Sequence, residues 1–231
     1  MALSRWLPLV VVVALLAGCG SSSKSNGVTF APPPTTPTST TANPNVRDAA
    51  GCFPVAQPPA KARTESKPST LLKTTKTYEV TIATNCGSFT FKIDQKQSPN
   101  NAASFVSLVQ HGFFDKTIFH RIAVGFVIQG GDPTATGNGG PGYTVVDTPP
   151  AGAVYSHGVV AMAKTSAAPN GTGGSQFFVV TVANAGLPAQ YAIIGKVVTG
   201  LAVVDRIGKL GDADQQPTET VEIERATVTI T

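Results

Sequence analysis

Residues 119–132 read FHRIAVGFVIQGGD and place a histidine and an arginine side by side, ahead of an apolar run and a glutamine. Arg121 has no carboxylate next to it in the sequence. Its guanidinium cannot be deprotonated in a protein, so it can donate hydrogen bonds but cannot exchange protons near neutral pH. The chemistry open to this stretch, which also carries His120 and Gln129, is therefore hydrogen-bond donation beside an apolar surface.

Two other kinds of site are disfavoured. The histidines, His111, His120 and His157, lack metal-ligand spacing and have no cysteine or carboxylate cluster beside them, so no metal site is expected. Residues 173–178, GGSQFF, do not match the G-x-S-x-G turn that carries a nucleophilic serine. Neither metal-assisted nor serine-based hydrolysis is indicated.

Short β-forming segments surround residues 119–132. Residues 77–84 (TYEVTIAT) alternate, and after a glycine turn residues 88–94 (SFTFKID) carry apolar side chains at period two. Two such runs around a glycine turn predict a hairpin. Further strands are expected at residues 118–122, 126–129, 143–146, 158–163, 176–182, 192–198 and 220–230.

Two helices accompany these strands. In the first, Ser98 is a suitable N-cap, Pro99 suits the first helical position and Gly112 ends the amphipathic pattern. The second is expected at about residues 200–207, with Thr199 as its N-cap.

The composition and these elements together predict a mainly β domain over residues 77–231. The chain is 42% apolar, which is enough to supply a core. Many short strands with glycine turns fit either a closed barrel or a sandwich. We favour the barrel, because two helices can cover its two ends.

Four more motifs follow residues 119–132 along the chain. They read GNGGPGY, GVVAMAK, NGTGGSQFFVV and AIIGKVVTGLAVVDRI. Their order and spacing resemble the cyclophilin family of peptidyl-prolyl cis-trans isomerases, from about Tyr78 to the C-terminus. The resemblance implies an eight-stranded closed antiparallel β-barrel capped by two α-helices. It also implies an enzyme that needs no cofactor and acts on proline-containing polypeptide segments.

The resemblance also implies which residues form the site, at the positions that match the motifs of the family. Arg121 is the expected principal catalytic residue, with His120 beside it in the groove and Gln129 as a polar positioning group. The substrate-binding residues that the resemblance implies are Phe126, Val127, Gly137, Ala163, Lys164, Gln176, Phe178, Leu187 and Tyr191.

Rotation about an Xaa-Pro bond breaks amide resonance, at a cost of about 18–20 kcal/mol, without making or breaking a covalent bond. In the twisted state the proline nitrogen regains its lone pair, so an arginine donor aimed there would stabilise the transition state selectively. The alternatives left open are a non-catalytic proline-peptide-binding lipoprotein or holdase chaperone, and a purely structural envelope protein.

Three positions depart from the family pattern. Gly186 stands where well-known members have a tryptophan important for cyclosporin binding, so drug sensitivity is not expected to carry over. Tyr191 stands in place of a groove histidine. Lys164 stands where an asparagine is common, which predicts a preference for peptides with an acidic residue near the proline.

The N-terminus predicts export. Arg5 precedes an apolar run over residues 6–17 that is shorter than the roughly 20 residues of a membrane-spanning helix. Residues 1–18 therefore read as a signal peptide, and its end resembles a bacterial lipobox before Cys19. Lipidation of Cys19 would hold the exported protein at the cell membrane of a bacterial envelope. The alternative is an ordinary secretory signal that happens to contain a cysteine.

The next segments are expected to link the lipid to the domain. Residues 19–45 are rich in serine, threonine and proline and predict a disordered tether. Residues 46–76 predict an irregular segment that could dock on the domain. With Cys19 lipidated, Cys52 and Cys86 remain as an even pair that could form a disulfide in an exported protein, or stay as two free thiols.

The charge pattern limits the partners. The formal net charge is +4, but the lysines are scattered and form no basic stripe with interleaved aromatic residues. Nucleic acid is therefore not an expected partner. The expected partners are proline-containing polypeptides and, through the N-terminal lipid, a membrane, with the protein itself a monomer.

Overall fold

The computed structural model of the protein describes residues 45–231. The predicted signal peptide, Cys19 and all but the last residue of the predicted tether lie outside this range. Within the described residues, no helix is long and apolar enough to cross a membrane.

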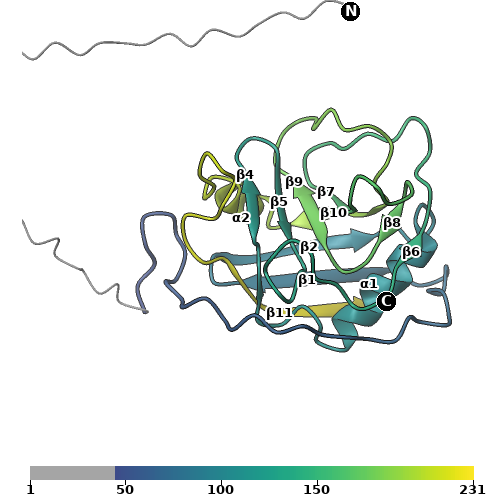
Figure 1. Cartoon of the computed structure of the whole chain (residues 1–231), viewed down its shortest axis with the longest axis horizontal. Coiled ribbons are helices and arrows are strands. Elements are labelled where there is room, and N and C mark those ends of the chain that lie inside the picture. The colour runs from purple at the N-terminus through teal and green to yellow at the C-terminus, as the bar shows by residue number, and fades with distance from the viewer. Residues whose placement is uncertain (1–44) are drawn as a thin grey trace, which may run out of the picture. The chain divides into compact units, whose positions relative to one another are not determined.

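The largest element is an antiparallel sheet of nine strands in the order β3-β11-β1-β2-β10-β7-β9-β5-β4 (Figure 1). A second sheet pairs β6 with β8. The strands are β1 (Tyr78–Thr84), β2 (Gly87–Ile93), β3 (Thr117–Ile118), β4 (Arg121–Ala123), β5 (Val127–Gly130), β6 (Val145–Val146), β7 (Val159–Met162), β8 (Thr172–Gly173), β9 (Phe177–Val180), β10 (Ile193–Thr199) and β11 (Glu222–Ile230).

The two edge strands of the large sheet are close in sequence. Only Phe119 and His120 separate β3 from β4, yet β3 pairs with β11 while β4 pairs with β5. The single strand expected at residues 118–122 is therefore two strands, because the chain changes partner in the middle. The prediction of a mainly β, antiparallel fold with two helices is confirmed. The closed eight-stranded barrel is not confirmed, because the described strands form a curled sheet of nine strands whose edge strands are β3 and β4.

Apolar side chains cover both faces of the strands near residues 119–132. Phe177 belongs to the main core, and its neighbour Phe178 belongs to a second apolar cluster on the other face. Ile128 and Val127 divide in the same way. Successive residues of a strand point to opposite faces, so one strand can pack the interior and also build an outer surface.

The first helix, α1 (Pro99–Gln110), begins after Ser98 as expected, but the Ser98 side chain makes no capping hydrogen bond. A distant residue caps the helix instead. Asp147 accepts hydrogen bonds from the backbone N–H groups of Asn100 (3.2 Å) and Asn101 (2.6 Å). A carboxylate at this end also complements the helix dipole.

The second helix, α2 (Leu201–Ile207), has Gly200 as its N-cap, so the expectation of Thr199 was wrong. Thr199 is the last residue of β10. Gly200 has a φ of 78°, and a Cβ there would lie 2.4 Å from the carbonyl oxygen of Ser88. The tight approach of the chain to β2 therefore requires glycine where the strand turns into the helix.

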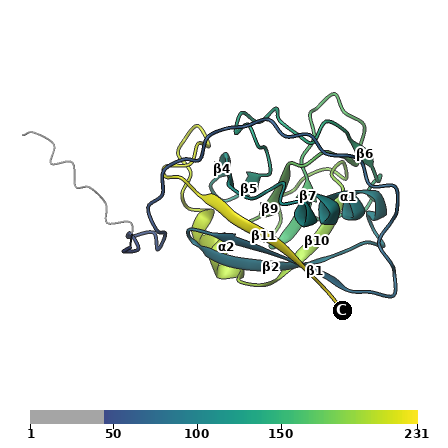
Figure 2. The same ribbon diagram turned by 90° about the horizontal axis from the view of Figure 1, so that it is seen from below.

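Residues 46–76 contain no helix or strand and run along the domain as a long irregular segment (Figure 2). The disulfide between Cys52 and Cys86 joins this segment to the β1–β2 turn. Backbone hydrogen bonds join Lys61 to the carbonyl of Pro133 and Glu65 to that of Pro141, both at 2.9 Å.

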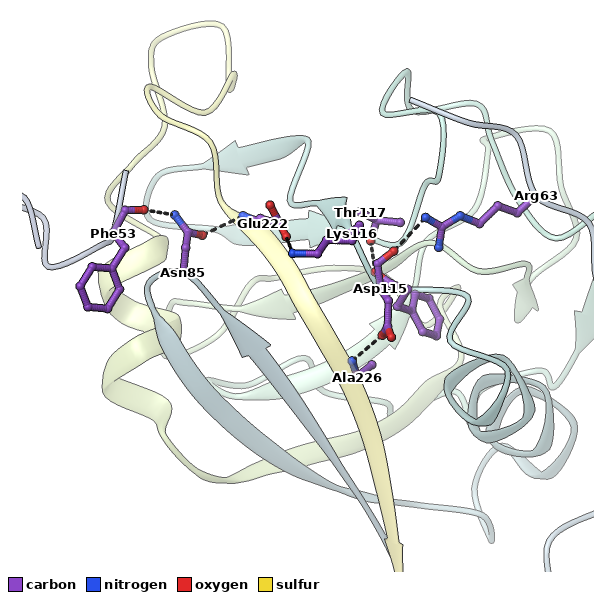
Figure 3. A network of polar contacts seen from close by, with 9 residues as sticks. Phe53, Arg63, Asn85, Asp115, Lys116, Thr117, Glu222 and Ala226 are labelled. Atoms are coloured by element: carbon purple, nitrogen blue, oxygen red, sulfur yellow. Dashed lines mark hydrogen bonds and ion pairs between the residues drawn. The ribbon is translucent and has the colours of Figure 1, made fainter. Parts of the chain in front are cut away.

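Side chains add further attachments to this segment (Figure 3). Arg63 donates from Nη2 to the carbonyl of Asp115 at 2.8 Å. Asn85 donates to the carbonyl of Phe53 at 2.9 Å and accepts from the backbone of Glu222 at 2.8 Å. The segment is thus bound directly to the loop after α1 and, through Asn85, to β11.

Candidate active site

Arg121 and Gln129 occupy directly opposite positions on β4 and β5, and Gln129 in turn faces Phe178 on β9. Directly opposed residues of an antiparallel pair project from the same face of the sheet. The guanidinium and the amide therefore meet: Arg121 Nη1 donates to Gln129 Oε1 at 3.1 Å.

A hollow of about 220 Å³ opens beside this pair. All nine residues that line it were expected site residues, drawn from four separate stretches of the chain. They are Arg121, Phe126, Val127, Gln129, Ala163, Lys164, Phe178, Leu187 and Tyr191. A mostly apolar cavity with a few polar groups at its edge is the usual form of a small binding site.

Two other expected residues, Gln176 and Gly137, line a larger hollow of about 790 Å³ next to the first. The two hollows share Gln129, Ala163 and Lys164. The structure therefore arranges all the expected catalytic and substrate-binding residues except His120 around two adjoining hollows.

The side-chain amides of Gln129 and Gln176 connect the two hollows through hydrogen bonds. Gln129 Nε2 donates to Gln176 Oε1 at 3.0 Å, and Gln176 Nε2 donates to the carbonyls of Gly137 and Gly139, both at 2.9 Å. Each glutamine accepts at one end and donates at the other, so both amides are held in one orientation. Gln129 consequently presents its oxygen, not its nitrogen, to Arg121.

Tyr155, which the sequence did not indicate as a site residue, supports the aromatic side chains of the smaller hollow. The rings of Phe178 and Tyr191 meet edge to face with centroids 5.5 Å apart. Below them, the fully buried Tyr155 donates its hydroxyl to the carbonyl of Tyr191 at 2.8 Å and accepts from the Tyr191 N–H at 2.9 Å. Burial raises the pKa of Tyr155, so the hydroxyl keeps the proton that it donates.

Gln215 is the second residue that sequence reasoning missed. Its Oε1 accepts a hydrogen bond from Arg121 Nε at 2.8 Å. It lies 94 residues away on the loop after α2 and belongs to none of the motifs, so no sequence signal placed it here. With Nε and Nη1 engaged, Nη2 is the guanidinium nitrogen that makes no hydrogen bond within residues 45–231.

His120 was an expected site residue but lines neither hollow. Its side chain is buried, and neither ring nitrogen has a hydrogen-bond partner among the described residues. Burial lowers the pKa of His120, with the Asp132 carboxylate acting in the opposite direction and the Arg121 charge adding to the decrease. The lowered pKa favours the neutral imidazole near neutral pH.

Lys164 lies at the edge shared by the two hollows. Its Nζ donates to the carbonyls of Thr165 (3.2 Å) and Ala168 (3.1 Å) and lies 5.7 Å from the centroid of the Tyr191 ring. Among the described residues it forms no ion pair with a carboxylate. The ammonium therefore remains available to an anionic group of a ligand.

One group of possible metal ligands, Asp48, Cys52 and Glu219, lies within residues 45–231, with its ligand atoms within 4.8 Å of one another. Cys52 is joined to Cys86, so its sulfur is not available as a thiolate ligand. This group is also distinct from the residues that line the two hollows.

The fold agrees with the comparisons to known proteins. A family model described as cyclophilin type peptidyl-prolyl cis-trans isomerase/CLD matches residues 79–228. The chain belongs to this family of isomerases. The whole segment that precedes β1 lies outside the match.

Individual relatives are similar over about two thirds of the chain. A peptidyl-prolyl cis-trans isomerase-like 1 of Neurospora crassa is 37% identical over 155 residues, which are 65% of this chain and 93% of the relative. A peptidyl-prolyl cis-trans isomerase of Helicobacter pylori is 38% identical over 140 residues, or 59% of this chain and 83% of the relative.

A solved structure matches the fold. The cyclophilin type isomerase of Cryptosporidium parvum, crystallised in the presence of the dipeptide Ala-Pro, has a TM-score of 0.60 and 33% sequence identity. The match covers 65% of this chain and 98% of that one.

Proposed function

We propose that this isomerase accelerates rotation about Xaa-Pro bonds by donating a hydrogen bond from Arg121 to the proline nitrogen. The observation that carries the proposal is the state of the guanidinium: two of its nitrogens are engaged by Gln129 and Gln215, and Nη2 is left without a partner in the described structure. Arg121 also lines the smaller hollow, where a proline ring would be bound.

The physical basis is selective stabilisation of the twisted amide. A planar amide nitrogen is a poor acceptor because its lone pair is delocalised, whereas the twisted nitrogen can accept. A hydrogen bond made only in the transition state raises the turnover rate. A charged donor contributes about 1.5–3 kcal/mol, which is roughly a ten- to hundredfold acceleration.

The apolar walls would hold the ring while the preceding carbonyl turns. Phe126, Val127, Phe178 and Leu187 all line the hollow, and Phe178 and Val127 are also packed into the second apolar cluster. A wall that is itself well packed is rigid. The ring would therefore stay in place during the rotation instead of moving with it.

The same proposal includes export and a lipid anchor at Cys19, with the protein acting as a monomer on exported or envelope proteins. Two observations support it: the signal-like pattern of residues 1–19 and the disulfide between Cys52 and Cys86. Disulfides persist in oxidising compartments. Outside the cytosol, prolyl isomerisation on a scale of tens of seconds would slow the folding of client chains.

Two experiments test these parts separately. Cis/trans exchange of an Ala-Ala-Pro-Phe peptide, followed by NMR, should accelerate when the full chain is added in mild detergent. Binding of the peptide without faster exchange would instead indicate a non-catalytic proline-peptide binder. For the anchor, mass spectrometry of the protein produced in a bacterium should find a lipidated Cys19 at the N-terminus, and an unmodified chain would refute it.

A further inference from the structure

Gln215 lies on the loop of residues 211–217, which is part of the connection between α2 and β11. The loop is fastened to β4 next to Arg121: the Ile122 N–H donates to the carbonyl of Gln215 at 2.9 Å. A Cβ on Gly211 would lie 2.0 Å from the carbonyl oxygen of Ile122. The backbone and the side chain of Gln215 thus contact consecutive residues of the same strand.

The backbone of Gln215 is in an unusual conformation. Its φ is 64°, one of three positive values among the described residues other than glycine. Such a conformation is unfavourable for a residue with a side chain and persists only where the surroundings impose it. Here Asp212 imposes it, because its carbonyl accepts from the Gln215 N–H at 3.1 Å and its Oδ1 accepts from the Gln216 N–H at 2.8 Å.

We propose that Gln215 is a positioning residue for Arg121, an inference that rests on the proposed function. An arginine held by Gln129 alone could still turn about that single hydrogen bond. Acceptors at both Nε and Nη1, one on β5 and one on the loop, fix the guanidinium plane. Nη2 then stays oriented between catalytic cycles, and positioning of this kind contributes to the rate.

The chemistry of the amide suits this role. An amide oxygen accepts a hydrogen bond without neutralising the guanidinium, whereas a carboxylate would form an ion pair and reduce the charge available to the twisted amide. One of the two acidic side chains in the loop is already engaged: Asp212 Oδ1 accepts from the backbone N–H groups of Asp214 (2.9 Å) and Gln216 (2.8 Å). The loop therefore supports Arg121 with a neutral acceptor.

The test compares Gln215→Ala and Gln215→Gly with Gln216→Ala in the full chain. Gln216 is the matched control, because it is also exposed and its contacts to the loop are made by its backbone. Either Gln215 variant should lower kcat by about three- to tenfold, as expected for one hydrogen bond, with peptide Kd changed less than about twofold. Gln215→Gly removes the backbone strain, so its loss of activity cannot be attributed to poor folding. Wild-type kcat in Gln215→Gly would overturn the proposal.

A second readout separates positioning from a general effect on the loop. In an Arg121→Lys background the Nε–H donor is absent, so adding Gln215→Ala should cause no further loss; fully additive effects would contradict the proposal. The NMR signal of the Arg121 Nε–Hε group should shift and exchange faster with solvent in Gln215→Gly. This signal decides the role of Gln215 even if the wild-type chain fails to catalyse exchange, since that failure would refute only the proposed function. An unchanged Nε–Hε signal would refute the positioning role.

Discussion

Arg121 and Gln129 are direct partners across β4 and β5, and Nη1 of the arginine donates to Oε1 of the glutamine at 3.1 Å. The orientation of this amide is set from the other side by Gln176, whose Oε1 accepts from Gln129 Nε2 at 3.0 Å. The candidate catalytic group is therefore connected through two glutamines to the loop that carries Gly137 and Gly139.

Replacing Gln129 by alanine should break this connection at its centre. Arg121 would lose one of two acceptors and Gln176 would lose its donor, so kcat/KM should fall by about three- to thirtyfold, as expected for one or two hydrogen bonds. Peptide exchange by NMR measures the change. Gln97→Ala is the matched control, because Gln97 lines neither hollow. An equal loss of kcat/KM in both variants would mean that the hydrogen bonds of Gln129 do not support catalysis.

Lys164 should favour peptides with an acidic residue beside the proline. A partly exposed ion pair is worth about 0.2–1 kcal/mol, so an Asp-containing peptide should bind roughly one and a half- to fivefold more tightly than its Lys counterpart. Lys164→Gln should abolish the difference, and added salt should reduce it. Calorimetric titration of the two peptides provides the measurement, and equal affinities for wild type would eliminate this preference.

Glu219 should make stability depend on pH. Its pKa is raised to about 7, first by burial and then by the hydrogen bond and charge of Asp48. The folded state thus binds this proton more tightly than the unfolded state, whose pKa is about 4.5. The stabilisation from this group is complete below pH 4.5 and is lost as the pH rises through 7.

Urea unfolding at pH 5 and pH 8 measures this dependence. From pH 5 to pH 8, wild type should lose stability relative to Glu219→Gln, in which this group no longer titrates. Glu224→Gln, an exposed position on β11, should behave like wild type. The comparison between variants cancels the opposite contribution of His120, whose lowered pKa destabilises the fold as the pH falls below about 6.5. Parallel pH profiles for wild type and Glu219→Gln would contradict the expectation.

The disulfide should contribute mainly to stability. It closes a loop with a sequence separation of 34, for which chain entropy gives about 3–4 kcal/mol. Cys52→Ala with Cys86→Ala should lower the urea midpoint accordingly while peptide exchange stays close to wild type, because neither cysteine lines the hollows. Reductant should lower the midpoint of wild type but leave the double variant unchanged. A double variant as stable as wild type would show that the segment is held by its polar contacts alone.

Local patterns could predict the elements and the motif residues, but not how distant segments meet. Alternation in β1 and β2 and the signals around α1 were sufficient to place those elements, since they depend on neighbours in sequence. The change of partner at Phe119 and His120 depends on β11, which lies about a hundred residues further on, so it gave no local signal.

The site shows the same limit. Arg121, Gln129 and Phe178 could be identified because they lie in motifs, whereas Tyr155 and Gln215 act through contacts that only the folded chain creates. His120 was expected in the groove from its place beside Arg121. The structure instead buries its side chain, at the point between β3 and β4 where the chain changes partner.

In the proposed mechanism, Arg121 stabilises the twisted amide and not the bound peptide. The most direct measurement is NMR exchange of the Ala-Ala-Pro-Phe peptide with wild type and Arg121→Ala, together with the Kd of each. We expect kcat to fall by about ten- to a hundredfold while Kd changes little. A loss of peptide binding that accounts for the whole loss of exchange, or an unchanged kcat, would contradict it.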